Sequence, residues 1–102
     1  MAAKDVVETT ILDNKIAIFS KSYCPYCKRA KALFAAKFPD VPTKIHELDL
    51  LGEEGSAIQQ YLLEKTGQRT VPNIFINEKF IGGCDSVTSL DQEGKLAGLI
   101  AA

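Results

Sequence analysis

Apolar positions in the first forty residues change from helical spacing to a continuous run and back again. Residues 4–12 carry apolar side chains at helical spacing, which predicts a short amphipathic helix. Residues 16–19 are uninterrupted apolar residues, typical of a strand buried on both faces. Residues 24–38 return to helical spacing, and Pro25 suits the first helical position. This part of the chain therefore predicts a helix, a buried strand and a second helix.

The second half of the chain continues the alternation of helices and strands. In chain order we expect a strand at residues 44–50, a loop at 52–55, a helix at 56–66, strands at 73–76 and 79–81 around a tight turn, and helical structure from residue 85 with a break near Gly94. The β-α-β start gives parallel strands, and the final hairpin adds antiparallel ones. The pattern predicts one α/β domain over residues 1–102, with a mixed four-stranded sheet flanked by helices on both faces.

Composition narrows the classes of partner. The chain is 46% hydrophobic and 25% charged, which is typical of a globular protein. A net charge of −1 offers no bulk attraction for nucleic acid. No apolar run approaches the ~18 residues that a membrane helix needs. The three cysteines are fewer than a disulfide-stapled secreted domain usually holds. We expect a cytoplasmic, monomeric protein that binds neither nucleic acid nor membranes.

A C-x-x-C pair, Cys24 and Cys27, lies where the buried strand gives way to a helix. Free N–H groups and the helix dipole favour negative charge at that end. Between residues 14 and 39 there is no Asp or Glu, whereas Lys and Arg are frequent. We predict that Cys24 has a pKa below the ~8.5 of a free cysteine and attacks disulfides. Cys27, one turn deeper on the same helical face, is the predicted resolving thiol.

Spacing alone leaves other interpretations of the cysteine pair open. It could be inert packing, or a zinc or iron site. For zinc, Cys84 and His46, the only histidine, could complete a Cys₃His set. Zinc sites usually bring paired ligands from two knuckles, and the chain has no second pair. Thiol redox chemistry is the favoured interpretation.

Two further segments also have alternative interpretations. Pro72 precedes a predicted strand, and a trans Val71–Pro72 bond is the common case for such a residue. In the segment after Gly83, Asp85 or Ser86 is either a helix N-cap or part of an anion site with free backbone N–H groups. Cys84 is expected to be a small packing residue rather than a third catalytic thiol.

Three motifs in this order resemble the glutaredoxin family, of the dithiol type. They are FSKSYCPYC at residues 19–27, TGQRTVPNIFI at 66–76 and FIGGCDS at 80–86. The resemblance implies a thioredoxin fold and a cis Pro72. It further implies a glutathione-dependent oxidoreductase that reduces protein–glutathione mixed disulfides and protein disulfides through Cys24 and Cys27.

The resemblance also implies a set of glutathione-binding residues. Lys21, Gln59 and Arg69 would hold the glycine carboxylate, Val71 beside Pro72 would pair with the cysteine backbone, Cys84, Asp85 and Ser86 would hold the γ-glutamyl end, and Tyr26 would flank the sulfur. Glutathionylated or disulfide-bonded proteins would be the substrates. NADPH and glutathione reductase would supply electrons indirectly, and no metal is expected. A [2Fe–2S] carrier is the second hypothesis, against which Pro25 counts.

Overall fold

The helices and strands follow the predicted alternation. The computed structural model describes residues 2–102. Its elements are α1 (Ala3–Asp13), β1 (Ile16–Ser20), α2 (Pro25–Lys37), β2 (Thr43–Glu47), the 3₁₀ turn η1 (Leu48–Leu50), α3 (Glu53–Thr66), β3 (Asn73–Ile76), β4 (Lys79–Gly82), α4 (Cys84–Gln92) and α5 (Leu96–Ala101). The assignment of residues 1–102 to one domain stays a prediction.

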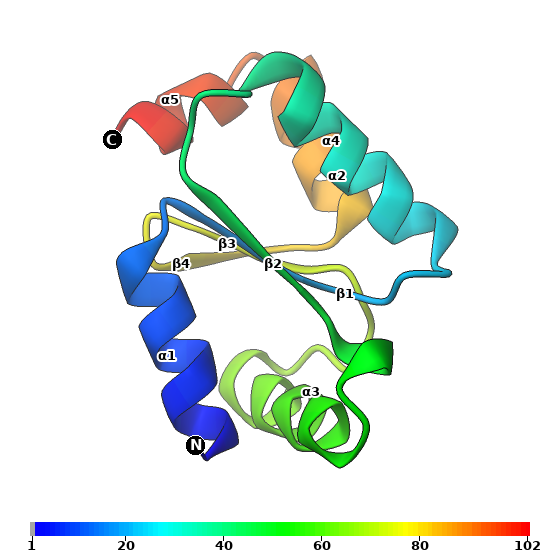
Figure 1. Cartoon of the computed structure of the whole chain (residues 1–102). Helices are drawn as coiled ribbons and strands as arrows, with labels where there is room; N and C mark the ends of the chain where they lie inside the picture. Colours follow the sequence, from blue (N-terminus) through cyan, green and yellow to red (C-terminus); the bar gives the residue numbers. More distant parts are fainter. Residues whose placement is uncertain (1) are drawn as a thin grey trace.

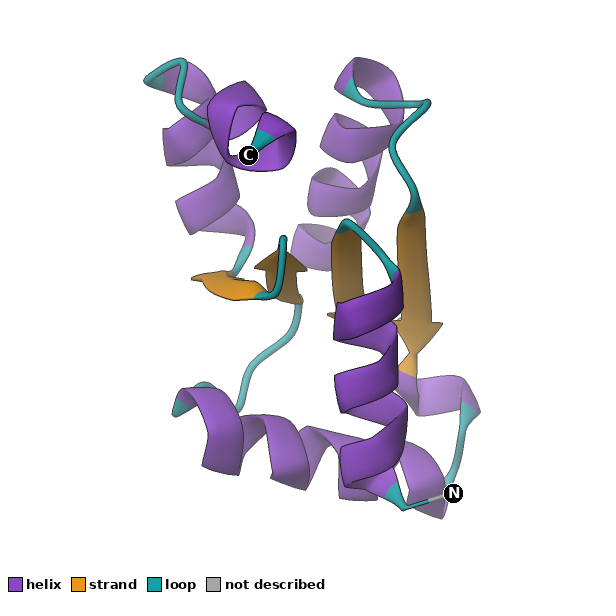
Figure 2. Ribbon diagram, turned by 90° about the vertical axis from the view of Figure 1, so that its left-hand side faces the viewer, coloured by secondary structure: helices purple, strands orange, loops and turns teal. Residues whose placement is uncertain are grey.

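The four strands form one mixed sheet in the order β2-β1-β3-β4. Strand β1 pairs in parallel with β2 and antiparallel with β3, and β3 pairs antiparallel with β4. Helices α1 and α3 cover one face, and α2, α4 and α5 cover the other (Figures 1 and 2). The predicted mixed sheet with helices on both faces is therefore confirmed.

Strand β1 separates two apolar clusters. Its residues Ile16 and Ile18 pack into a cluster with α2, α4 and α5. Ala17 and Phe19, which point to the opposite face, pack with α1 and α3. Every residue of β1 is buried, which explains why the strand is an apolar run without alternation. The chain leaves this rigid strand at Ser20 and enters the turn that precedes Cys24.

The segment between β2 and α3 differs from the prediction. The strand ends at Glu47, because Leu48 turns into the apolar cluster beside α3 and starts the 3₁₀ turn. Gly52 has φ +58°, a conformation that favours glycine, and helix α3 begins at Glu53 rather than at residue 56. Gly55, expected in a loop, is therefore a buried helical residue.

The hairpin and the last helices follow the prediction with one correction. Asn77 and Glu78 have φ of 49° and 69°, the positive values of a tight hairpin turn. Gly94 separates α4 from α5. The N-cap of α4 is Gly83, whose carbonyl accepts the first helical bond from Val87, so an N-cap at residue 85 or 86 is wrong. Within residues 2–102, no helix has the length and apolar character that crossing a membrane requires.

Candidate active site

Cys24 is the N-cap of helix α2, and Pro25 is its first helical residue. The carbonyl of Cys24 accepts the N–H of Lys28 at 3.0 Å, which closes the first turn. Its own N–H donates to the carbonyl of Lys21 at 3.1 Å. Pro25 has a φ suited to this position and lacks an N–H, so the helix can start immediately after the cysteine. The thiol therefore lies among the free N–H groups of the first turn.

The two thiols of the C-x-x-C pair differ in burial and in pKa. Both are free, Cys24 is half-buried, and Cys27 is 0% exposed. Burial disfavours the Cys24 thiolate, but the N–H and thiol of Cys27, with smaller contributions from Tyr26 and Lys21, lower the pKa of Cys24. Burial raises the pKa of Cys27, and the neighbouring Cys24 raises it further. The predicted order, with Cys24 outside and Cys27 inside, is confirmed.

A contact from η1 holds the turn before Cys24. The Asp49 carboxylate accepts the backbone N–H of Ser22 at 2.9 Å and also the Ser22 hydroxyl. The hydroxyl and the N–H of Ser22 lower the pKa of Asp49. Sequence reasoning missed this contact because it joins residues 27 positions apart, and a hydrophobic pattern does not show which polar side chains meet across that separation.

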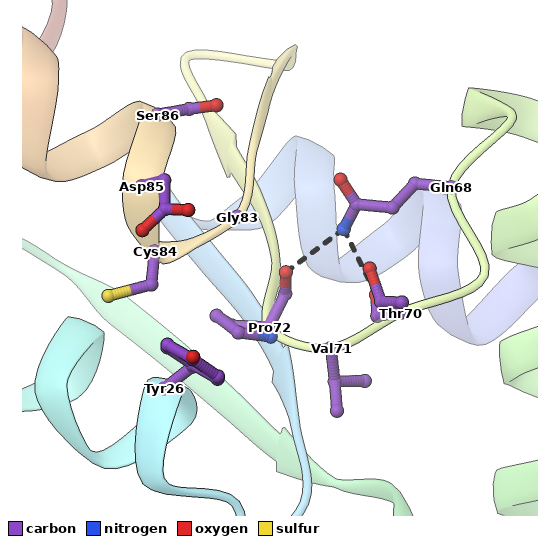
Figure 3. Close-up of a pocket in the computed structure, with 9 residues that line it drawn as sticks. All are labelled: Tyr26, Gln68, Thr70, Val71, Pro72, Gly83, Cys84, Asp85 and Ser86. Carbon is purple, nitrogen blue, oxygen red and sulfur yellow. Dashed lines mark hydrogen bonds between the residues drawn. The ribbon is translucent and has the colours of Figure 1, made fainter.

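A pocket of about 490 Å³ lies between the start of α2, the loop before β3 and the start of α4 (Figure 3). Six of the predicted binding residues line it: Tyr26, Val71, Pro72, Cys84, Asp85 and Ser86. Sequence reasoning missed Gln68, Thr70 and Gly83, which line it too. All three lie within the motifs at residues 66–76 and 80–86, and that position was the available signal. Single loop residues follow no hydrophobic pattern that would mark them as part of a pocket wall.

The loop before β3 brings its backbone to the Cys24 thiol. The Val71–Pro72 peptide bond is cis, as the family resemblance implied. The Cys24 thiol donates to the carbonyl oxygen of Val71 at an Sγ–O distance of 3.9 Å. Cys84 is buried, belongs to the apolar cluster beneath α4 and also forms part of the pocket wall. Its packing role is therefore confirmed.

The remaining predicted residues lie outside this pocket. Gln59 and Arg69 line a second, smaller pocket beside α3, and the Gln59 side-chain amide donates to the Arg69 carbonyl at 2.9 Å. Lys21 belongs to the turn before Cys24 and is half-buried. Its charge lowers the pKa of Cys24 from there. The structure thus divides the predicted set among one main pocket, one side pocket and the turn.

The alternative Cys₃His metal set is not assembled. His46 stacks on Phe19 with a ring-centroid distance of 5.6 Å, and its Nε2 lies 2.9 Å from the Thr10 hydroxyl of α1. Cys84 belongs to the cluster on the other face of the sheet. Among residues 2–102, no three His, Cys, Asp or Glu side chains are grouped to hold a metal ion.

The pocket offers one group that suits an anion and another that suits a cation. Helix α4 starts at Cys84 without a side-chain cap, so its first N–H groups are available to an anion. The exposed Asp85 carboxylate stands in the same turn and suits a cation. Together with the stabilised thiolate of Cys24, the arrangement can attack a disulfide that lies along the Val71 backbone and carries a zwitterionic end.

Comparisons with known proteins point to one family. A family model described as Glutaredoxin matches residues 16–81. Glutaredoxin-1 of Rhizophagus irregularis is 52% identical over 99 residues, covering 97% of this chain and 95% of that protein. The crystal structure of a buckwheat glutaredoxin–glutathione complex has a TM-score of 0.89 at 43% identity, covering 97% of this chain and 87% of that one. The holo form of glutaredoxin C1 from Populus tremula x tremuloides has a TM-score of 0.88 at 39% identity, covering 99% and 97%.

Proposed function

Because this chain belongs to the glutaredoxin family, it is a glutathione-dependent thiol–disulfide oxidoreductase with a thioredoxin fold, and we propose that Cys24 is its nucleophile and Cys27 its resolving thiol. The observation that supports this division is that the pKa of Cys24 is lowered and that of Cys27 is raised, together with the greater burial of Cys27. Only a thiolate attacks a disulfide sulfur. The half-buried Cys24 provides it, whereas the buried Cys27 keeps its proton until Cys24 has reacted.

We propose that glutathione lies along the main pocket with its sulfur at Cys24. The Val71 backbone would pair with the cysteinyl backbone of glutathione, beside Pro72 and the Tyr26 ring. The first N–H groups of α4, from Cys84 to Ser86, would hold the γ-glutamyl carboxylate, and Asp85 would hold the ammonium group. What supports this placement is the gathering of these residues around one pocket.

The glycine carboxylate of glutathione would extend toward Lys21, Gln59 and Arg69. Lys21 contributes positive charge close to Cys24. In the second pocket, one N–H of the Gln59 amide is used by the Arg69 carbonyl, and the other remains for a ligand. The Arg69 guanidinium adds a second cation at an exposed position.

Two reaction routes follow from this arrangement. In the monothiol route, the Cys24 thiolate attacks the glutathionyl sulfur of a mixed disulfide and releases the protein thiol. A second glutathione thiolate then attacks the Cys24–glutathione disulfide, freeing Cys24 and forming oxidised glutathione. In the dithiol route, Cys24 attacks a protein disulfide, and Cys27 displaces the bound protein thiol to form the Cys24–Cys27 disulfide. Two molecules of glutathione then reduce that disulfide.

The finer assignments concern partners and location. We propose that glutathionylated and disulfide-bonded proteins are the substrates, that NADPH and glutathione reductase regenerate the glutathione, and that the protein acts in the cytoplasm in electron transport. The exposed rings of Tyr23 and Tyr26, at 65% and 55% exposure, support contact with protein surfaces beside Cys24. Fractionation of cells that express the tagged protein tests the location.

A coupled turnover assay tests the proposal. A small glutathionylated disulfide is supplied with glutathione, glutathione reductase and NADPH, and NADPH oxidation is followed with and without glutathione. Cys24→Ser should abolish both routes. Cys27→Ser should retain deglutathionylation and lose the reduction of a protein disulfide. If Cys27→Ser abolishes both activities while remaining folded, the division of labour between the two cysteines is wrong.

A further inference from the structure

One side chain of the pocket wall bonds two backbone carbonyls of the loop that approaches the nucleophile. The Nε2 group of Gln68 donates to the carbonyl of Thr70 at 3.0 Å and to that of Pro72 at 3.0 Å (Figure 3). The carbonyl between them, that of Val71, faces the Cys24 thiol. The carbonyl groups of Thr70, Val71 and Pro72 therefore each accept a hydrogen bond. Gln68 is the donor to the first and the third.

These bonds determine where the Val71 N–H points. The carbonyl of Thr70 and the N–H of Val71 belong to the same planar trans peptide group, so they point in opposite directions. With the Thr70 oxygen held toward Gln68, the Val71 N–H points away from Gln68. A carbonyl that accepts a hydrogen bond also polarises the N–H of its own peptide group, which makes that N–H a better donor.

Gln68 is itself held at the end of helix α3. Its backbone N–H donates to the Thr66 hydroxyl at 3.1 Å, and that hydroxyl donates to the Leu62 carbonyl at 2.7 Å. The side-chain amide of Asn73, the first residue of β3, donates to the same hydroxyl at 3.3 Å. Gln68 thus connects the end of a rigid helix with the loop before β3.

We propose that Gln68 is a positioning residue that sets how tightly glutathione binds, because its amide aims the Val71 N–H at the backbone of glutathione. This inference rests on the proposed function, in which Val71 pairs with the cysteinyl part of glutathione. Gln68 takes no part in thiol exchange, so the chemical step after binding should not depend on it. No other residue type of similar length donates two hydrogen bonds to neutral carbonyls without adding a charge.

Three variants separate the hydrogen bonds from the bulk of the side chain. Gln68→Met keeps the length and removes both donors, and Gln68→Glu places a carboxylate against two carbonyl oxygens. Gln92→Met, at an exposed position at the end of α4, is the matched control. For Gln68→Met we expect KM for the glutathionylated substrate to rise about tenfold, the effect of losing two hydrogen bonds of modest net strength. The value of kcat should change by less than about twofold, and Gln68→Glu should show the larger rise in KM.

Two further measurements exclude a merely structural role. S-methylglutathione, which cannot exchange, should inhibit Gln68→Met with an inhibition constant raised in parallel with KM. The Val71 amide proton should shift upfield by NMR in this variant, because the Thr70 carbonyl of its peptide group loses a hydrogen bond, and it should not shift in Gln92→Met. If Gln68→Met does not fold, Gln68→Asn carries the same expectation, since the shorter amide cannot reach both carbonyls.

The outcomes distinguish this inference from the function on which it rests. If the wild-type chain does not turn over the glutathionylated substrate, the proposed function fails. If the wild type is active and the Gln68 variants keep its KM, the positioning role is overturned. A fall in kcat at constant KM also overturns it, because the residue would then act in the chemical step or in the fold rather than in binding.

Discussion

Replacing Gly55 by Ala tests the contact between α3 and η1. A Cβ atom at position 55 would lie 1.9 Å from the carbonyl oxygen of Leu48 and 2.9 Å from its carbonyl carbon. Both obstacles are backbone atoms, so no side-chain rotation relieves the overlap. The helix and the 3₁₀ turn would have to separate by about 1 Å in a tightly packed region. The substitution should therefore be destabilising despite its position in a helix.

Two opposing effects set the magnitude. Alanine in a helix interior is favoured over glycine by up to about 1 kcal/mol. Overpacking of a well-packed site typically costs about 1–3 kcal/mol, and a backbone obstacle places Gly55 at or above the upper end. We expect a net loss of about 2 kcal/mol, which corresponds to a fall in Tm of about 8–16 °C for a domain of this size.

Thermal and urea unfolding followed by circular dichroism under reducing conditions measures this loss. Gly98→Ala is the matched control, because Gly98 lies in α5 and a Cβ atom there meets nothing within 4 Å. It should leave Tm unchanged or raise it slightly. Since η1 also carries Asp49, which holds the turn before Cys24, Gly55→Ala should slow turnover as well. A Tm for Gly55→Ala at or above the wild-type value would refute the steric argument.

The remaining predictions concern ionisation. The rate of Cys24 alkylation should rise with pH and level off below the pH range of an ordinary cysteine, because its pKa is lowered. Lys21→Gln should move this rise in rate to higher pH. Equal titration of Cys24 and Cys27 would contradict the prediction. The hydrogen bond from Tyr61 to the Glu8 carboxylate raises the pKa of Tyr61 from 10.0 to about 12. The contribution of this hydrogen bond to the free energy of unfolding is therefore complete below pH 10.0 and is lost as the pH rises toward about 12. In Tyr61→Phe, the free energy of unfolding measured with urea should depend less on pH between 10.0 and about 12. An unchanged pH dependence would show that another group titrates in that range.

The two shifted thiols show how far local sequence signals reach. The apolar run of β1, the proline at the next helix start and the lack of acidic residues all lie within a few positions of Cys24. Strand burial, helix initiation and local charge depend on near neighbours, so the sequence could predict which cysteine is more exposed and has the lowered pKa. Local sequence signals could not exclude the Cys₃His metal site, because the distance between His46 and Cys84 depends on which faces of the sheet these residues occupy.

Element order, the mixed sheet and the thiol pair were determined by the sequence itself, since hydrophobic period and turn residues act over a few positions. The end of β2 before Leu48 and the close approach of Gly55 to the Leu48 carbonyl were decided by packing, because Leu48 belongs to the apolar cluster beside α3. The Gln68 bonds to the Thr70 and Pro72 carbonyls were decided by the tertiary structure as well. Hydrogen-bond directions depend on how a loop is held in space, and a hydrophobic pattern carries no information about them.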